Sequence, residues 1–266
     1  MDVLWRRLAR RGSSWALGGV FVLSAASAAR ARPTRPRFEP TDLELEDPGV
    51  AEFDLQFGVT HGDGDGGNRL ILPDFELDLG LTPNIEFDLD GAFSIDRFDQ
   101  PTRHLAGEAL WPAAKLGLFD SRAASGNDSF ALGVQLGPRI PTFGTRGVGY
   151  AALGLVGLNQ GHFHGVLNAG GIVDPGQRIT RGQSESVVAG LDVDLDLDDQ
   201  NTWSFISEFA VAHYVSTDPD EVSLSAGAAY DPTDRFELSL IVLGGFLPGA
   251  DRISVLLGVS PKASLF

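Results

Sequence analysis

Cysteine is absent from the 266 residues of this chain. Without a thiol there is no disulfide, no thiolate metal site and no cysteine nucleophile. The chain also lacks the N-terminal cysteine to which the lipid of a lipoprotein is attached. Long apolar segments are scarce too: the mean hydropathy is +0.01, and a helical membrane protein would be far more apolar. The sequence therefore excludes a disulfide-stapled domain and argues against a bundle of membrane helices.

Motifs of catalysis are missing as well. The sequence has no G-x-S-x-G nucleophile turn, no H-E-x-x-H zinc motif and no phosphate-binding P-loop. Serine and histidine occur, but no recognisable spacing links a nucleophile to a base and an orienting group. We therefore expect no enzyme activity, no catalytic residue and no cofactor.

Two segments have some of the ligands of a metal site, and neither has a full set. His162 and His164 are two residues apart, so on a strand they share one face, but no third ligand is evident. Asp63 and Asp65 stand among glycines without the twelve-residue spacing and closing glutamate of an EF-hand. We interpret the histidines as a surface or lumen pair and the aspartates as part of a flexible outer loop. No bound metal is expected.

Basic residues are few, with 20 Lys and Arg against 36 Asp and Glu and a formal net charge of −16. So acidic a chain repels the phosphates of nucleic acid, and we expect no nucleic acid partner. It also repels anionic lipid headgroups unless its carboxylates are hidden from them. The position of those carboxylates is therefore the main question that the sequence raises.

The N-terminal residues differ from the rest of the chain. Four arginines within the first eleven residues precede an apolar stretch, Trp15–Ala25, and small residues follow it. This layout predicts a secretory signal peptide at residues 1–31, exported by the Sec route and then removed. A membrane anchor is the alternative, and the short apolar stretch disfavours it, because a spanning helix needs about 20 apolar residues. Residues 32–50, rich in proline and charge, are expected to form an exposed leader.

From Ala51 onward, apolar and polar residues alternate with a period of two. The clearest run is Leu191–Asp198 (LDVDLDLD), in which each leucine or valine is followed by an aspartate. Alternation sends successive side chains to opposite faces of a strand, whereas no segment shows a sustained helical stripe. The sequence therefore predicts an all-β domain over residues 51–266.

Turn residues separate these runs into about twelve segments, so we expect about twelve antiparallel strands. Short and long connections largely alternate, as they do in transmembrane barrels, where short periplasmic turns oppose longer outer loops. Phe119–Ser129 is an exception, because the alternation of short and long connections requires a short turn there and the segment is longer than that. Several segments reach the roughly 9–11 residues that a tilted strand needs to cross a bilayer.

A soluble β-sandwich shows the same alternation with its apolar face inward, so the pattern alone leaves both folds open. Three features favour an antiparallel transmembrane β-barrel. An export signal precedes a chain without cysteine, aromatic residues stand near strand ends, and the chain ends in phenylalanine. Phe266 is expected to close the last strand and to be recognised by the barrel-assembly machinery. A bulge is needed to bring it into phase with the apolar residues of Ile253–Val259.

Five segments, taken in order, resemble those of a known family. The first two are an early strand before a glycine-rich loop (Phe53–Asn68) and a leucine-proline entry to a strand that ends in G-L-T (Leu72–Gly91). The other three are a strand that begins with lysine (Lys115–Phe119), a strand that leads into a proline-threonine loop (Leu132–Gly144) and a late turn (Ala228–Leu238). This order resembles the outer-membrane β-barrel transporters labelled "MetA-pathway of phenol degradation" over residues 50–266. The resemblance implies passage of aromatic hydrocarbons and brings no catalytic residues. The acidic strands and the phase of the C-terminus depart from the family.

In a membrane barrel the carboxylates belong on the inner face, because charge is costly against lipid. A carboxylate-lined interior favours cations. The alternative is a filled lumen in which acids pair with Lys115, Arg139 and Arg235, since side chains fill much of a small barrel. The acids expected to line the lumen are Glu76, Asp78, Glu86, Asp88, Asp90, Asp192, Asp194, Asp196, Glu208 and Glu237, with Asp54, Asp74 and Asp198 beside them; the lumen bases are Lys115 and Arg139.

Together these patterns predict a channel or transporter for small molecules in a Gram-negative outer membrane. The aromatic or hydrophobic cargo comes from the resemblance alone. The expected partners are outer-membrane lipid, the barrel-assembly machinery and an unidentified small solute. Three alternatives stay open: a structural barrel that transports nothing, a soluble exported β-sandwich that binds a ligand and, last, an outer-membrane enzyme.

Overall fold

The computed structural model describes residues 45–265, except for 63–66, 108, 122–128, 143–146, 175–183, 201, 216–218 and 234. The predicted signal peptide, most of the predicted leader and Phe266 lie outside these residues, as do Asp63 and Asp65. The regular structure of the described part is all β-strand, which confirms the predicted class. Within that part, no helix combines the length and the apolar character that crossing a membrane requires.

Thirteen strands follow one another along the described chain. Their bounds are β1 (Val50–His61), β2 (Asn68–Thr82), β3 (Ile85–Asp96), β4 (His104–Gly107), β5 (Trp111–Asp120), β6 (Ser129–Arg139), β7 (Gly149–Gln160), β8 (Phe163–Asp174), β9 (Ser184–Asp196), β10 (Trp203–Tyr214), β11 (Glu221–Thr233), β12 (Phe236–Gly245) and β13 (Ile253–Ser264). β4 has four residues, and the others have between 10 and 15. These long strands have the length that a tilted strand needs to cross a bilayer, about 9–11 residues.

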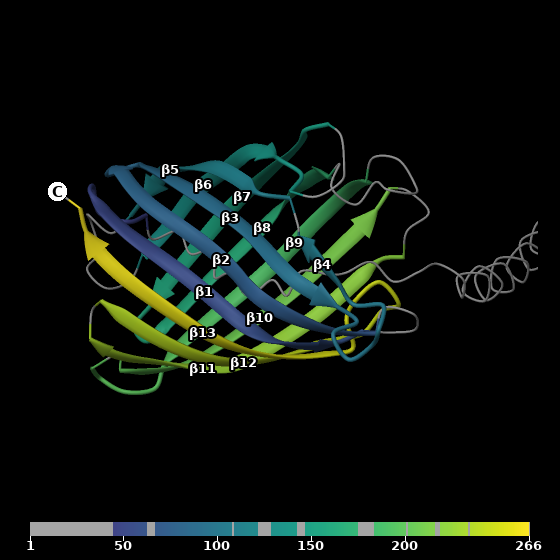
Figure 1. Cartoon of the computed structure of the whole chain (residues 1–266). Coiled ribbons are helices and arrows are strands. Elements are labelled where there is room, and N and C mark those ends of the chain that lie inside the picture. Colours follow the sequence, from purple (N-terminus) through teal and green to yellow (C-terminus); the bar gives the residue numbers. More distant parts are fainter. Residues whose placement is uncertain are drawn as a thin grey trace, which may run out of the picture. The chain divides into compact units, whose positions relative to one another are not determined.

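The twelve long strands close into an antiparallel barrel (Figure 1). From β5 to β13 each strand pairs with its neighbour in sequence, and β13 pairs with β1 from Val50↔Ser264 to His61↔Ile253. The pairs β1–β2, β2–β3 and β3–β5 complete the ring. Closure joins the two edges of the sheet to each other, which a sheet must do in hydrocarbon because lipid satisfies no backbone group. The predicted barrel of about twelve strands is confirmed.

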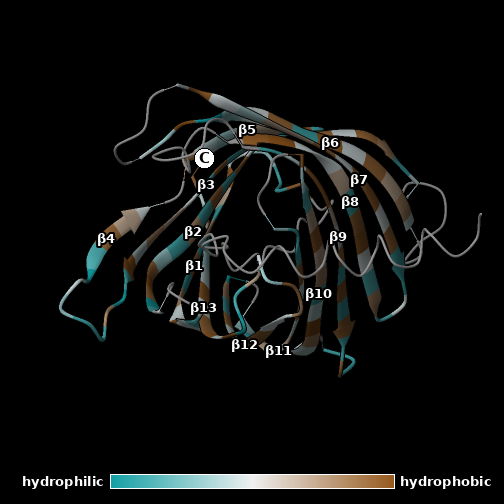
Figure 2. Cartoon of the chain, turned by 90° about the vertical axis from the view of Figure 1, so that its right-hand side faces the viewer, coloured by the Kyte–Doolittle hydropathy of each residue, from teal (hydrophilic) through white to brown (hydrophobic). Residues whose placement is uncertain are grey.

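β4 lies outside this ring, and the sequence did not predict it. It pairs with Phe93–Asp96 at the end of β3, whereas β5 pairs with the other half of β3, Ile85–Asp90. Figure 2 shows β4 to one side of the ring of strands. β3 is therefore shared between two partners, and only its first half belongs to the seam with β5.

Two predicted boundaries change in the structure. Leu72 and Pro73 lie inside β2 rather than at its entry, and the register shifts there because proline has no N–H for the ladder. Both ends of the segment from Phe119 to Ser129 belong to strands, since β5 ends at Asp120 and β6 begins at Ser129, and residues 122–128 lie outside the described part.

The two faces of the wall differ in exposure and in chemistry. On β12, Leu240 is 51 % and Val242 46 % exposed, whereas Ser239 is 8 % and Ile241 0 % exposed. Figure 2 shows apolar and polar residues alternating along the strands of the ring. Large apolar side chains thus cover the outer face, as in barrels that meet lipid. A soluble sandwich would instead bury its apolar face against a second sheet.

Candidate functional site

The predicted acids belong to the less exposed side of the wall. Glu86, Asp88 and Asp90 are each 1 % exposed. In a closed barrel whose outer positions are exposed and apolar, such alternate, buried positions point to the inner face. The other predicted acids are buried (Glu76, Asp192 and Glu208) or partly buried (Asp78, Asp194, Asp196 and Glu237), and the predicted bases Lys115 and Arg139 are buried.

Carboxylates face one another across the first three strands. Asp54 on β1 is opposite Glu76 on β2, which is opposite Asp90 on β3. Two residues away on each strand, a second row repeats the arrangement with Glu52, Asp78 and Asp88. Like charges directly opposite each other destabilise a sheet. These two rows, which we call the acidic rows, therefore need protons, basic side chains or bound cations to offset their repulsion.

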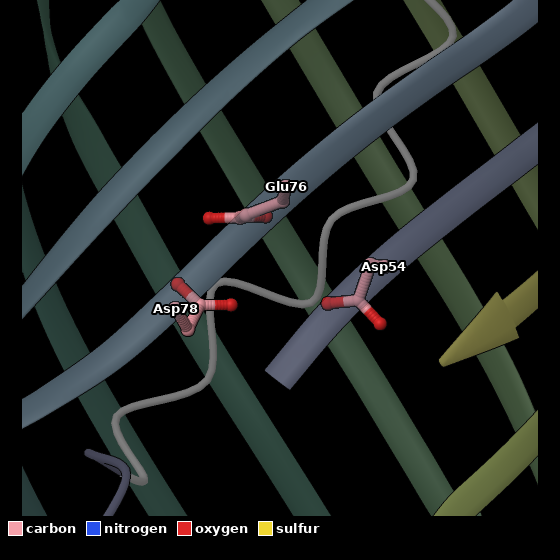
Figure 3. Close-up of side chains that lie close together, drawn as sticks. All are labelled: Asp54, Glu76 and Asp78. Carbon is pink, nitrogen blue, oxygen red and sulfur yellow. The ribbon is translucent and has the colours of Figure 1, made fainter. Parts of the chain in front are cut away.

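The acidic rows bring carboxylate oxygens close enough to share one ion. Figure 3 shows Asp54 reaching from β1 toward Glu76 and Asp78 on β2. One oxygen from each of these three residues lies within 4.8 Å of the others, and the same holds for Asp78, Glu86 and Asp88. Asp78 belongs to both groups and so joins them. Sequence reasoning predicted these acids but not that they converge, because the register between strands is not visible in the sequence.

Lys115 and Gln135 compensate part of this charge. The Lys115 Nζ donates to Glu86 Oε1 at 2.7 Å, with both side chains buried. The Gln135 Nε2 donates to Asp88 Oδ2, also at 2.7 Å. The hypothesis that lumen acids pair with Lys115 is therefore correct for Glu86. Gln135 was not predicted, although its position opposite Lys115 on β6 places it on the same face.

Arg139 and Arg235, the other two bases considered for these acids, differ from each other in burial. Arg139 is buried on β6, and its guanidinium carbon lies 5.9 Å from the centre of the Trp111 ring, within cation–π range. Arg235 is exposed in the turn before β12. Trp111 thus helps to hold one of the two arginines in the wall.

The end of the predicted leader packs against the barrel instead of standing free. The Lys262 Nζ lies 2.7 Å from Glu46 Oε1 and 2.9 Å from Glu52 Oε2, and the backbone N–H of Glu46 donates to Glu86. Gly80 leaves room for this segment, since a Cβ there would lie 2.3 Å from the carbonyl oxygens of Glu46 and Asp47. Sequence reasoning missed Glu46 and Lys262, and the one available signal is that Lys262 continues the alternation of β13.

The two histidines converge on Asp196. The His164 Nε2 lies 3.3 Å and the His162 Nδ1 4.0 Å from the same oxygen, Asp196 Oδ2. Both rings are more than a third exposed. A carboxylate neighbour for the pair was not predicted, because Asp196 belongs to β9 and the histidines flank the start of β8.

Part of the inner face is apolar, which the sequence analysis also missed. Ile206, Ile241 and Leu256 are buried and pack together with Ile71 and Ala229. The sequence signal is a break in alternation, since Leu240–Leu243 is apolar at every position and so places apolar side chains on both faces. A second buried cluster is formed by Trp111, Ala113, Ala151, Ile172, Val188 and Ala212. The interior thus combines carboxylates with packed apolar regions.

Comparison with known proteins gives matches of structure and none of sequence. No known family profile and no curated protein matches the chain. An outer-membrane channel from Pseudomonas putida F1 is similar at a TM-score of 0.59 and 14 % identity, over 85 % of this chain and 99 % of that one. The NanC porin is similar at 0.54 and 8 % identity, over 79 % and 100 %, and the KdgM porin at 0.50 and 8 %, over 80 % and 98 %.

These similarities establish the fold. The chain has the fold of outer-membrane β-barrels. The match extends over nearly the whole length of each of these three structures. At 8–14 % identity the likeness does not extend to what the neighbours transport. The phenol-degradation family stays a resemblance, since no family profile supports it.

Proposed function

We propose that this protein is an outer-membrane channel that passes small solutes and favours cations. The observation on which the proposal depends is the pairing of buried and partly buried carboxylates across β1, β2 and β3 behind an exposed apolar outer face. No catalytic role is proposed, because no recognisable spacing in the sequence links a nucleophile to a base and an orienting residue.

The outer face supports a position in lipid. Exposed leucine, valine, isoleucine and phenylalanine recur at alternate positions of nearly every long strand, and Leu167, Leu191 and Leu257 are examples at 51 %, 44 % and 59 % exposure. Contiguous exposed apolar surface on this scale is unfavourable in water. The same surface is stable against acyl chains, where a closed barrel satisfies its backbone groups internally.

The inner face supports the preference for cations. The acidic rows and the adjacent Glu86 place seven carboxylates on three neighbouring strands, where Lys115 contacts Glu86 and Lys262 contacts Glu52. On the other side of the barrel Asp192 on β9 faces Glu208 on β10. Carboxylates that line a pore lower the energy of a cation inside it and raise that of an anion. The identity of a larger solute, aromatic or otherwise, rests on the family resemblance alone.

A structural barrel with a filled interior is the second candidate. The buried Lys115–Glu86 pair and the packed cluster around Ile241 favour it, because both occupy the inside of the wall. Reconstitution separates the two. Purified protein in planar lipid bilayers gives discrete conductance steps, and proteoliposomes take up small solutes, if the channel proposal is right. Intact barrels that give neither conductance nor solute flux contradict it and favour the structural role.

A further inference from the structure

Two carboxylates of the second acidic row, Asp78 and Asp88, each keep one oxygen without a hydrogen-bond partner among the described residues. Asp78 and Asp88 are directly opposite each other on β2 and β3. Lys115 is engaged with Glu86, the third member of this group. Among the described residues, Asp78 Oδ1 and Asp88 Oδ1 are shielded from solvent and have no hydrogen-bond partner. One oxygen of Asp78 lies within 4.8 Å of one oxygen of Asp88, and carboxylates at that separation repel each other strongly in a medium of low polarity.

A neutral oxygen with the same deficit lies beside them. Gln135 is 2 % exposed, and its Nε2 donates to Asp88 Oδ2, which fixes the amide next to the carboxylate pair. Its Oε1 is shielded and has no donor among the described residues. Gln135 reaches Asp88 across β5, where Asp88 is opposite the small side chain of Ala113. A buried amide oxygen without a donor is costly, and this one belongs to the amide that contacts Asp88, so a cation beside Asp88 would satisfy oxygens of both residues.

We propose that Asp78, Asp88 and Gln135 bind one hard divalent cation, with Ca²⁺ as the favoured ion, on the inner face of β2, β3 and β6. Two carboxylates and an amide carbonyl form the all-oxygen donor set that Ca²⁺ takes, and water completes its six to eight ligands. Ca²⁺ also accepts the irregular geometry of donors drawn from three strands, whereas Mg²⁺ demands a near-ideal octahedron. The ion neutralises the second acidic row, and the adjacent Glu86–Lys115 pair supplies its outer support.

The site and the channel are separate claims. A cation held in the wall needs no open lumen, and a conducting lumen needs no resident ion at this position. The binding experiment is therefore done on folded full-length protein in detergent, after removal of metal with a chelator, and needs no measurement of transport.

The test is calorimetric titration with CaCl₂ at constant ionic strength, on the parent and on Asp78→Asn and Asp88→Asn. Asp192→Asn is the matched control, since it removes one buried lumen charge on β9 away from these residues. We expect the parent and Asp192→Asn each to bind about one Ca²⁺ saturably. In Asp78→Asn and Asp88→Asn the affinity for Ca²⁺ should fall at least tenfold, roughly the loss seen when groups around a metal are removed.

Two results overturn the proposal. One is the absence of saturable Ca²⁺ binding in the parent, which would mean that a shared proton neutralises Asp78 and Asp88. The other is binding of equal strength in the parent and in Asp78→Asn. Asp78 is only partly buried, so we expect Asp78→Asn to fold. If Asp88→Asn does not fold, the titration of Asp78→Asn decides the question by itself.

Discussion

Lys115 and Glu86 form a buried ion pair across β3 and β5, with Nζ and Oε1 2.7 Å apart. Their side chains are 5 % and 1 % exposed. A buried pair contributes little relative to an apolar pair of the same shape, but removing one partner leaves an uncompensated charge in the wall. The pair therefore gives a direct measure of how strongly the interior depends on charge balance.

Lys115→Met is expected to destabilise the barrel by about 3–5 kcal/mol, because Glu86 then stays buried without its cation. The double variant Lys115→Met/Glu86→Gln should recover much of that loss, because it removes both charges. Urea unfolding in lipid vesicles, followed by tryptophan fluorescence, measures both. Arg235→Met, which removes an exposed positive charge, is the control and should stay within about 0.5 kcal/mol of the parent. Equal stability of Lys115→Met and this control would contradict the charge-balance account.

Gly80→Ala is expected to displace residues 46 and 47 from the wall, because the added Cβ would lie 2.3 Å from two backbone oxygens. We expect a loss of about 1–3 kcal/mol, the usual range for overpacking. Gly154→Ala is the matched control, since its Cβ would meet only Ala169 O at 3.8 Å. Protease cleavage before Val50 provides a second readout, and the segment should be cut faster in Gly80→Ala. Identical cleavage in the two variants would mean that the contact with Gly80 does not hold this segment.

Leu240→Arg tests which face meets lipid. Leu240 is half exposed at the middle of β12, and an arginine facing the bilayer midplane costs about 2–4 kcal/mol. Leu105 has a similar exposure, 59 %, but lies on β4 outside the ring, so Leu105→Arg should cost little. Unfolding in vesicles measures both. If Leu240→Arg were as mild as an ordinary surface substitution, within about 0.5 kcal/mol, the outer face would be in water and the barrel would not span a membrane.

Much of the fold followed from the sequence because alternation is a local signal. A run such as Leu191–Asp198 sets both the strand and its two faces, and turn residues set the strand count. β4 escaped prediction because a four-residue strand is too short to show a period. Leu72–Pro73 was placed at a strand entry because a bulge that restores the ladder around proline depends on both neighbouring strands.

The site was predicted less completely because it depends on register. The sequence indicated that Asp78 and Asp88 share a face, but only the pairing of β2 with β3 makes them opposite neighbours. Gln135 is the one polar side chain between Ser129 and Arg139 on β6, but it carries no charge and its own segment does not show that it reaches Asp88. Lys262 follows Pro261 near the C-terminus, and its contact with Glu46 joins two segments that are far apart in sequence.

The central claim, a channel whose carboxylates favour cations, is tested most directly by the reversal potential across a planar bilayer under a KCl gradient. We expect the parent to favour K⁺ over Cl⁻, and Glu76→Gln/Asp90→Asn/Asp192→Asn/Glu208→Gln, which neutralises two facing carboxylate pairs, to lose most of that preference. Asp199→Asn, which removes a fully exposed charge in the turn after β9, should leave the preference unchanged. A preference for Cl⁻ in the parent, or the same potential in the parent and the four-residue variant, would contradict the account.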